Sequence, residues 1–192
     1  MTPVSARAVA IGASAGAVQA LLRILPVLPV TYPLPILIVV HVPPDRTNAL
    51  VALFRANCQL PVKEAEDKEP IVGGVIYFAP SDYHLLVEDG GSLALSSDEL
   101  VNHSRPAIDI MLETAADAYG PALTGIVLTG ANHDGAAGLK AVADAGGEVI
   151  VEDPAEAQVS TMPAAALAAC PNAKSLTLDG ITSHLLKLAA IR

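Results

Sequence analysis

Three residues of the 192-residue chain, Ser14, His41 and Asp134, are the side-chain types that together activate a serine hydroxyl. In such a relay an imidazole takes the serine proton during attack, and a carboxylate orients the imidazole and stabilises the imidazolium that forms. The three residues are far apart in the chain. They can act together only if the surrounding elements bring them to one place.

Each of the three residues follows an apolar run that predicts a short buried strand: Ala8–Gly12, Pro35–Val40 and Leu123–Leu128. Helical patterns follow these strands near residues 18–25, 47–58 and 136–145. Repeated strand–turn–helix units predict an α/β fold with a doubly wound, mostly parallel sheet. Ligands of such sheets bind outside the carboxyl ends of the strands, so all three side chains are expected on one rim.

The rest of the chain adds a small antiparallel excursion and further α/β elements. The excursion is predicted from Val75–Ala79, His84–Glu88 and Leu93–Ser96, short runs separated by turn residues. A helix is predicted to begin with Pro106 in its first position and to end at Gly120. A fourth strand and two closing helices are expected at Glu148–Val151, Pro163–Ala169 and Ile181–Ala190.

Each candidate residue also has a plainer interpretation. Ser14 could cap the following helix, and its G-x-S-x-G context is short enough to occur by chance. His41 could be a loop residue before Pro43, and Asp134 could cap the helix beginning near Gly135. Their coincidence at one sheet edge favours the catalytic interpretation over the three separate ones.

Composition excludes several classes of function. The formal net charge of −9 and the absence of a Lys/Arg cluster argue against nucleic-acid binding and against attachment to a membrane surface. The apolar runs are too short to span a bilayer, and no secretory signal is evident. Cys58 and Cys170 are expected to be free thiols in the cytoplasm. No histidine pair has metal-ligand spacing, so no metal site is expected.

Several longer segments, in order, resemble the catalytic domain of the chemotaxis protein-glutamate methylesterase (CheB-type) family. They cover nearly the whole chain: AIGASAG (Ala10–Gly16), VVHVP (Val39–Pro43), VKEAEDKEP (Val62–Pro70), YFAPSDYHL (Tyr77–Leu85), VNHSRPAIDIML (Val101–Leu112), IVLTG with HDGAAGL (Ile126–Leu139) and TMPAAA (Thr161–Ala166). Agreement of several segments in one order is much more specific than any single motif.

The resemblance implies a doubly wound sheet with a β-hairpin and a hydrolase without a cofactor. The expected reaction is hydrolysis of γ-glutamyl methyl esters on the cytoplasmic helices of methyl-accepting chemoreceptors, with deamidation of receptor glutamines as a second activity. The family's nucleophile, histidine and aspartate fall on Ser14, His41 and Asp134. We expect a single catalytic domain over residues 1–192, with a core of about 7–190 and no receiver domain. The receptor helices are the expected partner, and a separate response-regulator receiver is a further candidate partner.

The chain departs from the family pattern in two loops. The family's Ser-Thr-Gly-Gly is Ser14-Ala15-Gly16-Ala17 here, and its Gly-Met-Gly-Asn-Asp-Gly is replaced by Gly130-Ala131-Asn132-His133-Asp134-Gly135. The resemblance places a backbone oxyanion donor on Ala131, and Ala15 is the second backbone candidate. Loss of one such donor costs roughly 10²–10³ in rate, so these changes predict a slower enzyme or an altered substrate preference.

Three other functions compete with this interpretation. A nucleotide-binding oxidoreductase would need a further glycine at Val18 and a Tyr-x-x-x-Lys pair, and the chain has neither. An α/β-hydrolase-fold esterase would have the order Ser, acid, His, and His184 lies in a predicted closing helix. A non-enzymatic module that docks on receptors would retain the fold, but it would not require the three relay residues.

Overall fold

The computed structural model describes residues 7–41 and 47–190, which form one seven-stranded parallel sheet and a separate two-stranded hairpin. The order of the large sheet is β3-β4-β2-β1-β7-β8-β9, and each neighbouring pair is parallel. Its strands are β1 (Ala8–Ala13), β2 (Ile36–Val40), β3 (Val62–Glu64), β4 (Ile76–Phe78), β7 (Leu123–Val127), β8 (Glu148–Glu152) and β9 (Lys174–Leu176). The predicted doubly wound α/β fold is confirmed.

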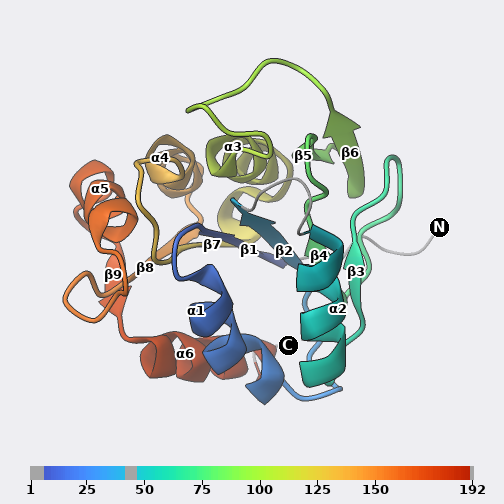
Figure 1. Ribbon diagram of the computed structural model, residues 1–192, viewed down its shortest axis with the longest axis horizontal. Helices are drawn as coiled ribbons and strands as arrows, with labels where there is room; N and C mark the ends of the chain where they lie inside the picture. Colours follow the sequence, from blue (N-terminus) through green and yellow to red (C-terminus); the bar gives the residue numbers. More distant parts are fainter. Residues whose placement is uncertain (1–6, 42–46, 191–192) are drawn as a thin grey trace.

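Helices cover both faces of the sheet (Figure 1). One face carries α1 (Ala17–Ile24), α2 (Thr47–Asn57) and α6 (Leu178–Ala190); the other carries α3 (Ile108–Tyr119), α4 (Ala136–Asp144) and α5 (Thr161–Ala169). Short 3₁₀ turns, η1 (Leu25–Val27) and η2 (Gly120–Ala122), follow α1 and α3. In the described part of the chain no helix is both long and apolar enough to cross a bilayer.

A hydrophobic core lies on each face of the sheet, because successive side chains of a buried strand point to opposite faces. In β1, Val9 and Ile11 belong to the core under α1 and α6, whereas Ala8 and Ala10 belong to the core under α3 and α4. Gly12 faces the same side as Ala8 and Ala10, and a β-carbon at this position would lie 2.2 Å from Ile108 Cγ2. The first turn of α3 therefore packs directly on the carboxyl end of β1.

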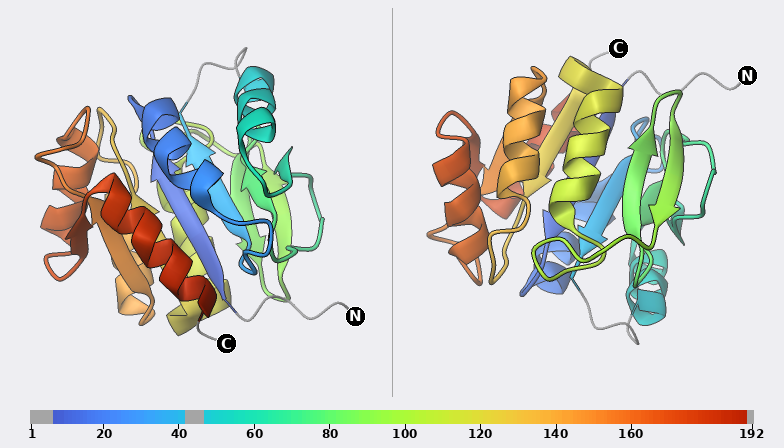
Figure 2. Two further views of the ribbon diagram at one scale, coloured as in Figure 1. Left: turned by 90° about the horizontal axis from the view of Figure 1, so that it is seen from below. Right: turned by 90° about the horizontal axis from the view of Figure 1, so that it is seen from above.

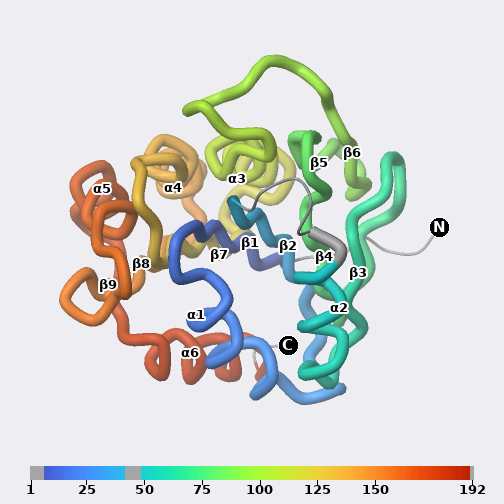
Figure 3. Tube along the Cα trace, viewed as in Figure 1, coloured from blue at the N-terminus to red at the C-terminus, as the bar shows by residue number. Residues whose placement is uncertain are grey.

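The path of the chain creates a switch point between β1 and β7. From the central strand β1 the chain passes to β2 on one side and later returns to β7 on the other, as the tube in Figure 3 shows. Crevices at such points are the usual ligand sites of doubly wound sheets. The loops after β1 and β7 carry Ser14 and Asp134, so two of the candidate residues flank this point.

The antiparallel excursion is smaller than predicted. The hairpin consists of β5 (His84–Glu88) and β6 (Ser92–Ser96) and lies beside α3 (Figure 2). The predicted third member, Val75–Ala79, is instead β4, which pairs in parallel with β2 and β3 in the main sheet. The edge strands β3 and β9 were not predicted.

The predicted start of the helix at Pro106 is also wrong. α3 begins at Ile108, and Ala107 before it is extended, with φ −102° and ψ 139°. The N–H groups of Ala107 and Ile108 are bound by His84 and Asp134, from distant parts of the chain, so tertiary partners set this boundary. The predicted end is correct, because Gly120 follows the last turn.

Candidate active site

Ser14 lies in a sharp strand-to-helix turn at the switch point. Its backbone N–H donates to Thr129 O at 2.9 Å, just beyond β7, and its carbonyl accepts the N–H of Ala17 at 2.9 Å. Gly16 makes the turn possible with a φ of 87°, a value that few residues other than glycine adopt. The half-buried Ser14 is thereby held between two loops at the N-terminus of α1.

His41 is placed next to Ser14 by the register of the two central strands. Ala13 of β1 pairs with Val40 of β2, and the N–H of His41 donates to Ala13 O at 3.2 Å. The His41 side chain is 13% exposed. The turn predicted after it, with Pro43, lies outside the described residues.

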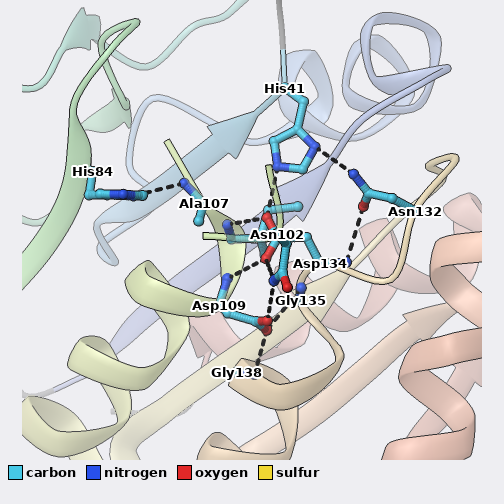
Figure 4. A network of polar contacts seen from close by, with 10 residues as sticks. His41, His84, Asn102, Ala107, Asp109, Asn132, Asp134, Gly135 and Gly138 are labelled. Carbon is cyan, nitrogen blue, oxygen red and sulfur yellow. Dashed lines mark hydrogen bonds and ion pairs between the residues drawn. The ribbon is translucent and has the colours of Figure 1, made fainter. Parts of the chain in front are cut away.

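Asp134 is fully buried and accepts four hydrogen bonds (Figure 4). Its Oδ2 accepts from His41 Nε2 at 2.8 Å and from the Ile108 N–H at 2.6 Å. Its Oδ1 accepts from the Asp109 N–H at 3.0 Å and from Asn102 Nδ2 at 2.9 Å. Burial alone would raise the pKa of this carboxyl, but the four donors outweigh burial and lower it below its ordinary value. Asp134 is therefore ionised at neutral pH.

The ionised carboxylate determines the tautomer of His41. Because Asp134 can only accept, Nε2 of the neutral imidazole carries the hydrogen, and Nδ1 keeps the lone pair that can take a proton. That nitrogen lies 3.4 Å from the side-chain amide nitrogen of Asn132. Among the described residues Ser14 Oγ has no hydrogen-bond partner. Ser14 and His41 are therefore brought together by the pairing of β1 and β2 and not by a hydrogen bond between their side chains.

The two candidate oxyanion donors lie on either side of the switch point. Ala15 directly follows Ser14, and Ala131 lies in the loop after β7. Both residues are exposed, and within the described ranges their N–H groups donate no hydrogen bond. Free N–H groups beside a nucleophile are the usual donors to a developing oxyanion.

Thr129 joins the loop of Ser14 to the neighbouring loops. Its hydroxyl donates to Ala15 O at 2.8 Å and accepts the N–H of Val159 at 2.9 Å. Its own N–H donates to the buried carboxylate of Glu152 at 2.7 Å. A cavity of about 190 Å³ opens beside this junction, lined by Gly16, Gln19, Ala20, Arg23, Thr129, Glu152, Glu156, Gln158 and Leu178.

The other histidines do not join the relay in this structure. The buried His84 donates from Nε2 to Glu99 O at 2.8 Å, and its Nδ1 accepts the N–H of Ala107 at 3.2 Å. His184, which lies in α6, pairs with Glu148 at 2.7 Å. His103 and His133 are exposed.

Sequence reasoning assigned no role to two residues beside Asp134. Asn102 donates to both Asp134 and Asp109, and the 6%-exposed Asp109 accepts the N–H groups of Gly135 and Gly138 at 2.9 and 2.7 Å. One signal was available: Asp109 is an acidic residue among apolar residues in the first turn of a helix. The plainer interpretation of Asp134 is also wrong in detail, because it caps α3 rather than the helix that follows it.

Comparison with known proteins gives a consistent result. The profile of the CheB methylesterase family matches residues 9–185. A Leptospira interrogans protein, provisionally named a protein-glutamate methylesterase/protein-glutamine glutaminase, is 41% identical over 181 residues, which are 94% of this chain and 94% of that protein. A Thermotoga maritima protein-glutamate methylesterase/protein-glutamine glutaminase is 38% identical, over 95% of this chain and 51% of its own length.

A solved structure extends the similarity to three dimensions. The crystal structure of the Thermotoga maritima CheB methylesterase catalytic domain superimposes with a TM-score of 0.92 at 36% identity, covering 96% of this chain and all of that one. Identity at this level over nearly the whole chain goes beyond a shared fold. The chain belongs to the CheB methylesterase family.

Proposed function

We propose that this protein is a protein-glutamate methylesterase that removes methyl groups from glutamyl esters on the cytoplasmic helices of chemoreceptors, and that it also deamidates receptor glutamines. The names of its relatives support both activities. The observation that carries the proposal is the 2.8 Å pair of His41 and the buried Asp134, placed beside Ser14 at the switch point of the sheet. A separate receiver protein as regulator is part of the proposal.

The reaction is a two-step acyl transfer. Ser14 Oγ attacks the ester carbonyl while Nδ1 of His41 takes its proton, and the imidazolium is stabilised by Asp134 through Nε2. The N–H groups of Ala15 and Ala131 hold the oxyanion. The C–O bond to methanol breaks as His41 returns the proton to the leaving oxygen. Water then attacks the acyl-enzyme with the same base and frees the carboxylate and Ser14.

Deamidation uses the same steps with a different leaving group. A glutamine amide carries –NH₂ where the ester carries –OCH₃, so the proton from His41 leaves with ammonia instead of methanol. An amide is less reactive than an ester, so we expect deamidation to be the slower reaction and to depend on the same three side chains.

The test is methanol release from methylated receptor fragments by the protein and its Ser14→Ala variant. We expect Ser14→Ala to lose roughly 10⁴-fold or more in kcat, because the nucleophile is removed while binding is kept. Ser81→Ala, at a half-buried serine outside the proposed relay, is the matched control and should retain activity. Receptor binding without Ser14-dependent release would overturn the proposal in favour of a docking module.

A further inference from the structure

We infer that Asn102 is a positioning residue for Asp134: its amide bridges the carboxylates of Asp109 and Asp134 and turns Oδ2 of Asp134 toward His41. The inference rests on the proposed function, because it gives a role to a side chain behind the proposed relay. Asn102 does not contact His41 in the described network, and it acts only through Asp134 (Figure 4).

The amide nitrogen of Asn102 has two hydrogens, and each has a separate acceptor. One goes to Asp109 Oδ2 at 2.7 Å and the other to Asp134 Oδ1 at 2.9 Å. Two buried carboxylates this close repel each other, and burial together with the charge of Asp134 raises the pKa of Asp109 above its ordinary value. A neutral group with two donors on one atom is the chemistry that satisfies both carboxylates without adding charge.

The two carboxylates are also locked by an exchange of helix caps. Asp134, which precedes α4, accepts the N–H groups of Ile108 and Asp109 at the start of α3. Asp109, in the first turn of α3, accepts the N–H groups of Gly135 and Gly138 at the start of α4. Each carboxylate thus occupies the N-terminus of the other's helix, where unpaired N–H groups favour negative charge. The cap exchange fixes the distance between the helices, and Asn102 fixes the rotation of the carboxylates.

The backbone presents the Asn102 amide in a preset orientation. Val101 and Ser104 exchange two backbone hydrogen bonds, 3.1 and 2.9 Å, around a two-residue turn. The two central residues, Asn102 and His103, have φ values of 51° and 62°. Such turns need positive φ at both positions, and asparagine is among the few non-glycine residues that adopt it readily. The turn therefore holds the amide in place at little cost.

The consequence for the proposed relay is that the two carboxylate oxygens of Asp134 accept hydrogen bonds from different donors. Oδ1 receives Asn102 and the Asp109 N–H, which leaves Oδ2 for His41 and the Ile108 N–H. Without the amide, Oδ1 loses a donor that lowers the pKa of Asp134, and Asp109 loses the bond that offsets its repulsion. The carboxylate can then rotate, and the hydrogen bond to His41 Nε2 loosens.

The test compares Asn102→Gly with His103→Gly in the full chain. Glycine suits the positive φ at both positions, so the turn is kept, and His103 is exposed and outside the network. We expect Asn102→Gly to lower kcat about 10- to 100-fold with little change in KM, since small misplacement of a catalytic group has effects of this size. His103→Gly should retain wild-type kcat. Equal kcat values for the two variants would overturn the inference.

A second readout does not depend on esterase activity. The proton on His41 Nε2, held by Asp134, should give a low-field NMR resonance that broadens or shifts in Asn102→Gly but not in His103→Gly. Asn102→Asp keeps the shape and the turn but replaces the donors with a third carboxylate, and should weaken the same resonance. An unchanged resonance in both Asn102 variants would overturn the inference.

A double-mutant cycle separates a role through Asp134 from a general structural role. On an Asp134→Asn background, Asn102→Gly should cause little further loss of kcat, because the interaction it supports is already gone. Full additivity would overturn the inference. If wild type shows no Ser14-dependent release but the NMR effect is present, the proposed function fails and the positioning of Asp134 by Asn102 stands.

Discussion

At the scale of single residues, the hydroxyl of Thr129 links the loop of Ser14, the proposed nucleophile, to the loop of Val159. Thr129→Val keeps the shape but leaves Ala15 O and the N–H of Val159 without their bonds at 2.8 and 2.9 Å. We expect a loss of about 1–3 kcal/mol in unfolding free energy, together with a lower kcat because the Ser14 loop loosens. Chemical denaturation and methanol release measure the two effects.

The matched control is Thr124→Val in β7, the strand that precedes Thr129. Thr124 is equally buried, but its hydroxyl is 3.5 Å from Glu148 Oε2, at the opposite end of β7 from Ser14. This variant should retain kcat. A Thr129→Val enzyme with wild-type kcat would show that the loop is positioned without the hydroxyl.

Asn132 is the clearest point at which this chain differs from the family pattern at the relay. Its Nδ2 lies 3.4 Å from His41 Nδ1, the nitrogen that takes the serine proton in the proposed reaction, while its Oδ1 accepts the N–H of Asp134 at 3.0 Å. Asn132→Gly frees Nδ1, and we expect kcat to rise about two- to fivefold, in proportion to a weak hydrogen bond of up to ~1 kcal/mol.

Asn132→Gly also removes the hydrogen bond from the Asp134 N–H to Asn132 Oδ1, which stabilises the turn before Asp134. The unfolding free energy of the variant should therefore be lower by about 0.5–1.5 kcal/mol. His133→Gly, at the exposed neighbouring residue, is the control and should leave kcat unchanged. A fall in kcat for Asn132→Gly would mean that the amide orients the imidazole rather than competing for it.

The candidate residues could be predicted because each follows a strand with a strong local signal. Parallel strands place their carboxyl ends on one edge, so the positions of Ser14, His41 and Asp134 in the chain were enough to expect them on one rim. Asn102 and Asp109 could not be found in this way. Their contacts depend on how α3 and α4 meet, and no local pattern encodes an exchange of caps between two helices.

At the scale of elements, the contact between α3 and α4 depends on Gly138. A β-carbon there would lie 2.7 Å from Leu112 Cβ and 2.9 Å from the backbone of Asp109, which cannot move aside easily. Gly138→Ala gains about 1 kcal/mol in helix propensity, but overpacking costs about 1–3 kcal/mol and separates the two helices. We therefore expect net destabilisation and a lower kcat, since the displaced helices would distort the hydrogen bond from the residue 138 N–H to Asp109, which is 2.7 Å long in the wild-type protein.

Ala137→Ser, on the exposed face of the same helix, is the control for Gly138→Ala and should change neither property. Denaturation midpoints and methanol release test both variants. A Gly138→Ala protein more stable than wild type would show that α3 and α4 can repack without loss.

The sequence did not predict helix and strand boundaries correctly where contacts with distant parts of the chain, rather than the local pattern, determine them. The edge strands β3 and β9 have three residues each and become strands only by pairing with β4 and β8. The segment Val75–Ala79 was predicted to be antiparallel because it is one of three short runs separated by turn residues, and its sequence cannot reveal that β2 is its partner. The start of α3 was wrong because its capping groups, on His84 and Asp134, are distant in the chain.

At the scale of the whole molecule, the pH dependence of the unfolding free energy is the sum of contributions from the buried acidic residues. Two of these residues, Asp134 and Glu152, have pKa values that are shifted in opposite directions, so their contributions change with pH in opposite directions. Asp134 has a lowered pKa, so its contribution is present above its ordinary pKa and is lost as pH falls through the folded value. Glu152 is 2% exposed, and its pKa is raised, first by burial and also by the charge of Glu156. Its contribution is complete below the ordinary pKa and is lost as pH rises through the folded value.

Glu152→Gln isolates one of these opposing contributions. Glutamine stays neutral, and its side-chain oxygen can still accept the Thr129 N–H that Glu152 accepts at 2.7 Å. The variant should therefore gain stability relative to wild type as pH rises from about 4 to 7, because only wild type must ionise a buried carboxyl. Urea denaturation across this range measures the difference, with the exposed Glu99→Gln as a control that should show no such trend. An advantage that shrinks with rising pH would mean that the Glu152 carboxylate is stabilised in the fold, and that the Thr129 loop depends on its charge.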